Sequence, residues 1–211
     1  MSSLEKRKEG MGPGEYEQKA VEAGFVRVCG CDEAGAGPLA GPVYAAAVIL
    51  PDGAVVDGLN DSKKLSAKQR EAVRGRILET ALDSAVAFAT VEEIEALNIL
   101  GASLLAMRRA VEALRVRPAL LLIDGSVARG FAQPAVAVVG GDARCPSIAA
   151  ASVLAKVARD AYCAEADALY PQYGFAQHKG YGTKAHREAL LRYGPCPLHR
   201  PSFLKKLWGK V

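Results

Sequence analysis

Four carboxylates are the side chains of this sequence whose spacing could do chemistry together. Asp32 and Glu33 are adjacent and follow a short apolar run. Asp124 ends a second apolar run, and Asp142 comes just after a third. Each carboxylate is ordinary by itself, but four held close together would repel one another unless cations lay between them. Mg²⁺ prefers oxygen ligands, and two such ions can flank a phosphodiester and stabilise its attacking and leaving oxygens.

The segment that must position the first two acids is 25–51. A predicted buried strand at 25–31 is followed by the acidic pair at 32–33. A turn-rich stretch with three glycines at 34–42 then leads to a second predicted strand at 43–50. Bare glycine backbone lets a phosphate or sugar approach closely. Asp32 and Glu33 cannot both point from a regular strand toward one ligand, but one can if the other lies at the strand's end. A β-turn that merely begins with two acids is the alternative.

The rest of the chain alternates helices and strands. Helices are predicted over 15–23, 67–83 with Ser66 as N-cap, 91–97, 102–114, 147–169 and 185–193, and strands over 84–91, 118–123 and 135–139. Residues 170–181 are loop-like. Continuous apolar strands mixed with helices indicate an α/β sheet covered on both faces, with the acidic positions clustered at one edge. We expect a flexible segment at 1–14 and a single domain over 15–211.

Composition and charge narrow the function classes. Half of the 211 residues are hydrophobic, no apolar run is long enough to cross a membrane, and the polar N-terminus lacks a secretory signal, so we expect a cytoplasmic protein. The net charge of +4 is unevenly spread, because residues 178–211 carry eight Lys or Arg and one acid, or +7, which leaves −3 for residues 1–177. A basic segment beside an acidic body suits an anionic polymer bound next to a metal site. A solvated basic tail is the alternative.

Other chemistries have weaker support. The five cysteines include no C-x-x-C pair, and Cys29 and Cys31 share one face of a predicted strand, where we expect them to pack as small hydrophobes rather than to bind zinc. The three histidines all lie late in the chain, and no G-x-S-x-G stretch accompanies them, which disfavours a serine–histidine triad.

Several ordered blocks together resemble the ribonuclease HII family. They are residues 31–43 (CDEAGAGPLAGPV), 60–65 (NDSKKL), 123–125 (IDG), 141–142 (GD), 147–160, 178–186 and 199–203. The resemblance implies an α/β fold with an RNase H-like mixed sheet flanked by helices and a C-terminal helical segment. It also implies metal-dependent hydrolysis of RNA in RNA–DNA hybrids and incision 5′ of single ribonucleotides in duplex DNA, as in ribonucleotide excision repair. These nucleic acids are the expected partners of a monomeric enzyme.

Carried over by position, the family's acidic cluster is Asp32, Glu33, Asp124 and Asp142. The resemblance implies that these residues hold two Mg²⁺ or Mn²⁺ ions with the scissile phosphate. A metal-bound water would attack in line and leave a 3′-hydroxyl and a 5′-phosphate. Asp32 and Asp124 are the strongest candidates for direct metal ligands.

Substrate recognition is expected from two glycine-rich segments. Tyr181 resembles the family tyrosine that packs on the sugar next to the RNA–DNA junction, although an exposed tyrosine in a glycine loop is the alternative. Gly35-Ala36-Gly37 stands where the family usually has Gly-Arg-Gly. The backbone donors of this loop survive, but the cationic fork of the arginine is missing. We therefore expect weaker substrate binding or relaxed junction preference with intact metal chemistry.

Further candidate contacts come from polar residues near the cluster. Ser62, Lys63 and Lys64 could hold phosphates or could simply form a helix-capping turn. Lys156, four residues before Asp160 on a predicted helix, could contact the site or could form a helical ion pair.

Three other functions compete with this interpretation. Ribonuclease HIII also lacks the arginine but usually carries an additional N-terminal domain, which we do not expect from the 24 residues before Phe25. A catalytically silent hybrid-binding protein would have no use for clustered negative charge without metal. A paired-carboxylate glycosidase would not need the basic segment, and its activity would survive chelation by EDTA.

Overall fold

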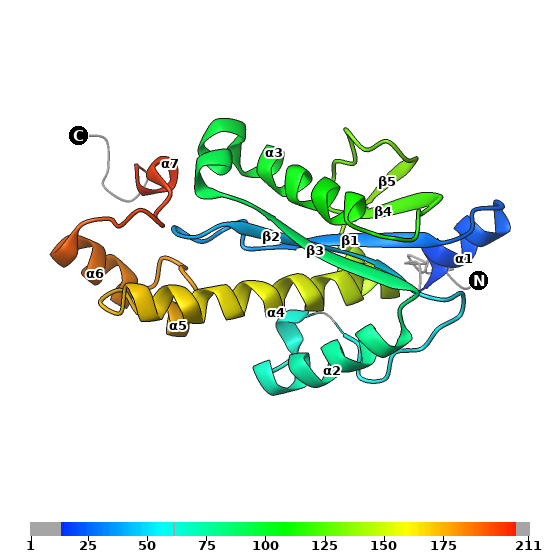
Figure 1. Cartoon of the computed structure of the whole chain (residues 1–211), viewed down its shortest axis with the longest axis horizontal. Coiled ribbons are helices and arrows are strands. Elements are labelled where there is room, and N and C mark those ends of the chain that lie inside the picture. Colours follow the sequence, from blue (N-terminus) through cyan, green and yellow to red (C-terminus); the bar gives the residue numbers. More distant parts are fainter. Residues whose placement is uncertain (1–13, 61, 206–211) are drawn as a thin grey trace, which may run out of the picture.

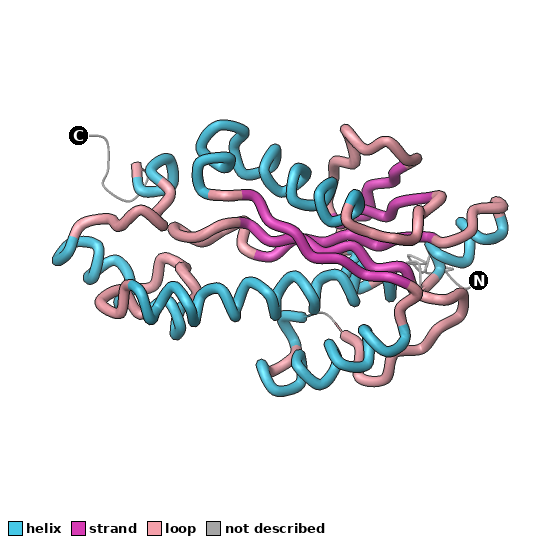
Figure 2. The backbone as a smooth tube through the Cα atoms, in the orientation of Figure 1, coloured by secondary structure: helices cyan, strands magenta, loops and turns pink. Residues whose placement is uncertain are grey.

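The structure is a computed structural model that describes residues 14–60 and 62–205. Five strands form one sheet in the order β3-β2-β1-β4-β5 (Figure 1; strands are magenta in Figure 2). Their bounds are β1 Val28–Ala34, β2 Val43–Ile49, β3 Asp83–Ala89, β4 Leu120–Asp124 and β5 Ala135–Val138. β2 is antiparallel to β1 and β3, whereas β1, β4 and β5 are parallel, so the sheet is mixed.

Helices cover both faces of the sheet. They are α1 Glu15–Glu22, α2 Ala67–Thr80, α3 Val91–Glu112, α4 Pro146–Leu169, α5 Phe175–His178, α6 Lys184–Tyr193 and α7 Pro201–Leu204, with 3₁₀ turns η1 Ser62–Lys64 and η2 Gly141–Ala143. α3 lies on one face, and α4 with α2 lies on the other (Figure 1). α5, α6 and α7 gather beyond the C-terminal end of α4, at the left of Figure 1. The predicted fold class, including the C-terminal helical segment, is confirmed.

The central strand β1 carries the acidic pair inside it. The expectation that the strand ends before these residues is wrong, because Asp32, Glu33 and Ala34 continue the antiparallel ladder with β2. Alternate residues of a strand face opposite layers. Cys29 and Cys31 accordingly pack into the apolar core under α3, as expected of small hydrophobes.

Helix α3 replaces two predicted helices. The interruption expected between residues 97 and 102 is reduced to one residue, Asn98, whose φ is 57°. Its side-chain oxygen accepts hydrogen bonds from the backbone N–H groups of Leu100 and Gly101, at 3.0 and 3.2 Å. Asn98 therefore acts as an internal cap that lets the helix resume in a new direction, which is consistent with its tolerance of left-handed backbone.

Three smaller predictions need correction. α2 ends at Thr80, because Asp83 already pairs with Ile49 as the first residue of β3. The segment predicted as a loop over 170–181 contains the short helix α5, and α7 was not predicted. The predicted flexible segment, apart from Gly14, and residues 206–211 of the basic segment lie outside the described residues. No described helix is long and apolar enough to cross a membrane.

The spacing between sheet and helix is set by a missing side chain. A Cβ atom at Gly30 would overlap the backbone of Ser147 and Ile148 and would lie 2.6 Å from Oγ of Ser147. The first turn of α4 therefore rests directly on β1. This close approach also fixes the distance between α4 and Asp32, two residues further along the same face of β1.

We predict that Gly30→Ala lowers the free energy of unfolding by at least about 3 kcal/mol, because overpacking against backbone is relieved only by moving α4. Gly75→Ala is the matched control, since a Cβ at this helical glycine meets nothing within 4 Å. It should raise stability by up to about 1 kcal/mol through helix propensity. Urea unfolding measures both, and equal effects of the two substitutions would contradict the proposed contact.

Candidate active site

Strand register brings the two central carboxylates together. Cys31 of β1 is paired with Ile123 of the parallel strand β4, so the next residues, Asp32 and Asp124, lie side by side where β4 ends. Asp142 joins them from η2, just after β5, the strand parallel to β4. Three consecutive positions in the sheet order thus converge at one edge, although the acids are far apart in the sequence.

Local hydrogen bonds hold these groups in place. One carboxylate oxygen of Asp124 accepts a hydrogen bond from the backbone N–H of Gly141 at 2.7 Å, which ties η2 to β4. Oδ1 of Asp32 accepts from the N–H of Glu33 at 2.7 Å. Asp32 is almost fully buried, and the hydroxyl of Ser152 on α4 supports its ionised form. The turn η2 and the helix α4 thus supply hydrogen bonds to the two central carboxylates, from Gly141 to Asp124 and from Ser152 to Asp32.

The carboxylates repel one another. Burial, followed by the charges of Glu33 and Asp124, raises the pKa of Asp32 well above its ordinary range. Burial and the charge of Asp124 likewise raise the pKa of Glu33 to about 7, and burial raises that of Asp124. The nearby Lys63 opposes the shift for Glu33 and Asp124. A cluster that is costly to ionise by itself is the environment in which a bound cation gives the largest gain.

Lys63 is the cation that this cluster already has. Its Nζ lies 3.1 Å from Oδ2 of Asp142, and the lysine side chain is 77% exposed while that of Asp142 is 10% exposed. The all-oxygen donor set fits a hard divalent cation. Within residues 14–60 and 62–205, no three acidic, histidine or cysteine side chains yet converge as a ready-made metal site. A bound cation would therefore compete with Lys63 for the carboxylate of Asp142.

The glycine loop, residues 35–41, is held from inside the protein. Arg200 is completely buried and donates hydrogen bonds of 2.8–3.1 Å to four backbone carbonyls of the loop, those of Gly35, Ala36, Pro38 and Gly41. Burial, followed by the charge of the neighbouring Arg159, lowers the pKa of Arg200 to about 9. Gly35 itself needs a φ of 101° and lies against the Arg159 side chain. The loop's shape is thus imposed by a distant residue.

A second arginine joins this loop to the segment around Tyr181. Arg159 on α4 is 1% exposed and donates to the carbonyls of Ala40 at 3.3 Å and Lys179 at 3.0 Å. The N–H of Leu39 also bonds to the carbonyl of Gly180 at 2.8 Å. As a result, the half-exposed ring of Tyr181 lies beside the backbone of Gly37. The structure therefore brings together the two segments expected to contact substrate.

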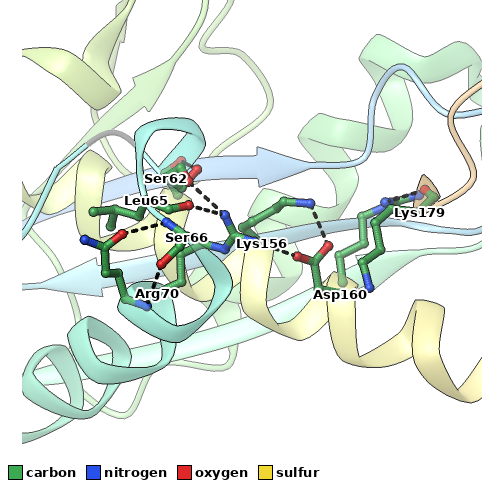
Figure 3. Close-up of polar contacts among 10 residues, drawn as sticks. Ser62, Leu65, Ser66, Arg70, Lys156, Asp160 and Lys179 are labelled. Carbon is green, nitrogen blue, oxygen red and sulfur yellow. Dashed lines mark hydrogen bonds and ion pairs between the residues drawn. The ribbon is translucent and has the colours of Figure 1, made fainter. Parts of the chain in front are cut away.

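Two other predicted contacts lie elsewhere. Ser62 is buried, and its hydroxyl is 2.8 Å from that of Ser152, which places it behind Asp32 rather than at the surface. Lys156 forms the helical ion pair with Asp160, at 2.6 Å, and Asp160 also binds Arg70 of α2 at 3.1 Å (Figure 3). The Lys156 contact thus lies within α4, and the Arg70–Asp160 pair links α4 to α2. The helix cap in this region is provided by Ser66.

Sequence reasoning missed three supporting residues. Arg159 carries a faint signal, because it stands four residues from Ala155 and from Cys163 on a buried helix face where a charge is unexpected. Ser152 and Arg200 lie within blocks that carried the family resemblance, but no pattern marks their partners. Their roles depend on contacts between distant parts of the chain.

Comparisons with known proteins agree with this architecture. Residues 29–211 match the family model described as Ribonuclease HII. The chain is 59% identical over 176 residues to ribonuclease HII of Albidiferax ferrireducens, covering 83% of this chain and 85% of the relative. The fold resembles that of ribonuclease H2 from Pyrococcus horikoshii, with a TM-score of 0.70, 24% identity, and coverage of 85% and 96% of the two chains. Bst-RNase HIII in complex with Mn²⁺ is more distant, with a TM-score of 0.59, 17% identity, and coverage of 79% and 62%.

The family match and the curated relatives define a nuclease of the ribonuclease H class, and the fold agrees with that class. Within that class, the chain belongs to the ribonuclease HII family. It is accordingly an endoribonuclease, a hydrolase of phosphodiester bonds. The similarity to Bst-RNase HIII, the rival family, is one of fold, at 17% identity.

The raised pKa of Glu33 predicts an unusual pH dependence of stability in EDTA. Between its ordinary value of 4.5 and about 7, folded Glu33 keeps a proton that the unfolded chain has lost. The free energy of unfolding should therefore fall as pH rises through this window, by up to about 3 kcal/mol. Glu33→Gln should flatten the slope and stabilise the protein at about pH 8.

Urea unfolding at several pH values measures this effect, with the exposed Glu22→Gln as control. An unchanged slope in Glu33→Gln would show that Glu33 does not govern the dependence.

Proposed function

We propose that this protein hydrolyses the RNA strand of RNA–DNA hybrids and incises on the 5′ side of single ribonucleotides in duplex DNA, leaving 3′-hydroxyl and 5′-phosphate ends. The observation that carries the proposal is the convergence of mutually repelling carboxylates beside the segment that presents Tyr181. Membership of the ribonuclease HII family supports it.

Asp32 and Asp124 would hold two Mg²⁺ or Mn²⁺ ions directly, with Glu33 and Asp142 completing the donor set. Bound divalent cations at such a site activate water and stabilise both oxygens of an in-line displacement. Ser152 favours the ionised form of Asp32, which a metal ligand needs. Lys63, exposed and on a flexible stem, would then contact a phosphate in place of Asp142.

The glycine loop is built for a phosphate or sugar to lie close. Arg200 binds the carbonyls of Gly35 and Ala36 from the protein interior, so these negatively polarised oxygens are turned away from an anionic strand. Tyr181 beside Gly37 offers an aromatic surface to a sugar. A ring packed there would favour a deoxyribose, which lacks the 2′-hydroxyl, and so would mark the DNA side of a junction.

Basic residues next to Tyr181 extend the proposed contact along the duplex. Lys184 and Arg187 are exposed on α6, and the Arg187 side chain lies close to the backbone of Gly182. Contacts of this kind bind the phosphate backbone without reading sequence, and they weaken as salt increases.

The test is incision of a labelled DNA duplex that carries one ribonucleotide, with Mg²⁺ or Mn²⁺, against an all-DNA duplex and an RNA–DNA hybrid. Metal-dependent incision 5′ of the ribonucleotide supports the full proposal. Cleavage of the hybrid alone means that junction reading is absent. Binding without cleavage points to a silent binder, and activity that survives EDTA excludes the metal-dependent mechanism.

We predict that Asp124→Asn lowers kcat by about 10³-fold, because one ligand charge worth several kcal/mol is lost. The same variant should weaken Mg²⁺ binding in calorimetry without substrate. Asp52→Asn, at an exposed carboxylate of the β2–α2 connection, is the control. Full activity of Asp124→Asn would show that Asp124 is not a metal ligand.

Position 36 gives a separate prediction. Ala36→Arg should lower KM about tenfold and make the enzyme more selective for one incision position. The reason is that a guanidinium group can form two parallel hydrogen bonds to phosphate or sugar oxygens. Ala36→Lys supplies charge without the fork and should lower KM without sharpening the position. The idea fails if Ala36→Arg changes neither quantity.

A further inference from the structure

All three histidines of the chain form one buried cluster beneath Tyr181. His178 comes from α5, His186 from α6, and His199 from the segment before α7. The rings of His178 and His186 are stacked with centroids 4.3 Å apart. The proposed chemistry uses none of them, and none contributes to the pKa shifts of Asp32, Glu33 or Asp124.

The hydrogen bonds of His186 fix where its proton lies. Its Nδ1 is 3.0 Å from the backbone carbonyl of Tyr181, and because a carbonyl only accepts, Nδ1 must carry the hydrogen. In a neutral ring, Nε2 is then an acceptor. This atom lies 3.0 Å from Nε2 of His199, so His199 must be the donor.

The chain of bonds continues in the same direction. Nδ1 of His199 has three contacts with Cys196, at 2.9 Å from the backbone N–H and at 3.2 Å from both the carbonyl and the thiol. With the proton on Nε2, Nδ1 is bare and accepts the N–H, which is the shortest of the three contacts. The order is therefore Cys196 to His199 to His186 to Tyr181, with every ring neutral and every ring nitrogen used. Burial, which lowers the pKa of His186 to about 4 and also lowers that of His199, agrees with neutral rings.

The ring of His178 also supports the segment that bears Tyr181. His178 accepts the N–H of Gly180 at Nδ1, at 3.2 Å, so its Nε2 carries the hydrogen and donates to the carbonyl of Tyr173 at 2.6 Å. The groups around the cluster are the aromatic rings of Tyr173 and Phe175 and the thiol of Cys196. Among the described residues, no carboxylate forms an ion pair with any of the three histidines.

The segment that bears Tyr181 needs such support. Gly180, with a φ of 79°, and Gly182 flank the tyrosine, and glycine gives the backbone wide freedom. The Tyr181 carbonyl accepts one further bond, from the N–H of Thr183 at 2.8 Å. The histidine bond comes instead from α6, and therefore anchors the tyrosine to a packed helix rather than to its own loop.

We propose that His186, oriented by His199, is a positioning residue that fixes the backbone of Tyr181 and thereby controls affinity for nucleic acid. The inference rests on the substrate role proposed for Tyr181. Since the cluster does not touch the carboxylates, loss of the bond should raise KM and leave kcat nearly unchanged.

Nitrogen NMR of the histidine rings at about pH 7.5 tests the bond chain directly. His186 should be the neutral Nδ1–H tautomer, and His178 and His199 should be neutral Nε2–H tautomers. A charged His186 or His199, or His186 as the Nε2–H form, overturns the proposal.

Cleavage kinetics on an RNA–DNA hybrid test whether loss of the His186 hydrogen bond raises KM. His186→Asn keeps an N–H donor near the Nδ1 position and should stay within about threefold of the parent KM. His186→Gln and His186→Ala lose that donor and should raise KM about tenfold, the effect of one buried hydrogen bond with its stranded partner. Leu190→Ala, a buried change on the same helix, should lower the melting temperature but leave KM unchanged. Equal KM values for the Asn and Gln variants would overturn the proposal.

Tyr181→Ala distinguishes the substrate role of Tyr181 from the positioning role of His186. If it raises KM while His186→Gln does not, the positioning role is wrong and the role of Tyr181 stands. If Tyr181→Ala leaves KM unchanged, the substrate role of the tyrosine is wrong, and the positioning role falls with it. If the parent protein cleaves no hybrid, the proposed function fails, while the NMR result still decides the bond chain.

Discussion

Arg200 binds the carbonyl oxygens of the glycine loop from within the core, and none of the ion pairs of the described residues includes it. Removing a charge from water costs several kcal/mol, and only well-made hydrogen bonds can offset this cost. Any other loop conformation would strand the guanidinium, so the loop has little choice of shape. Arg159 extends the constraint to the segment of Tyr181. One buried positive region thus defines the whole surface proposed for the substrate.

The acidic cluster is also a set of charges removed from water, but its charges are negative. Its carboxylates are brought together by strand register, and the charges of Glu33, Asp124 and Asp142 each raise the pKa of a neighbouring carboxyl group. The fold tolerates this repulsion because the sheet and α4 are tightly packed around it, with Gly30 removing the last obstacle to close approach. Stability is thereby exchanged for a site prepared for cations, a compromise that active sites commonly show.

The sequence predicts which strands carry the carboxylates, because apolar runs mark those strands, but it places Asp32 and Glu33 beyond the end of β1 rather than inside it. It does not predict the strand order that puts Asp32 beside Asp124, since that order depends on the whole sheet. The single helix α3 was also missed, because Asn98 resembles a break and in fact lets the helix continue. Arg200 was beyond pattern reasoning, as its partner Gly35 is 165 positions away.

That separation has a consequence for the growing chain. All five strands and the four acidic residues precede residue 143 and are made well before Arg200, and domains begin to fold as they emerge from the ribosome. Until then, the loop at residues 35–41 has no partner for the carbonyls that Arg200 will bind. A nascent chain could therefore assemble its acidic centre while the surface that selects nucleic acid is still unformed. The surface proposed to distinguish nucleic acids can therefore form only after residue 200 has been added to the chain.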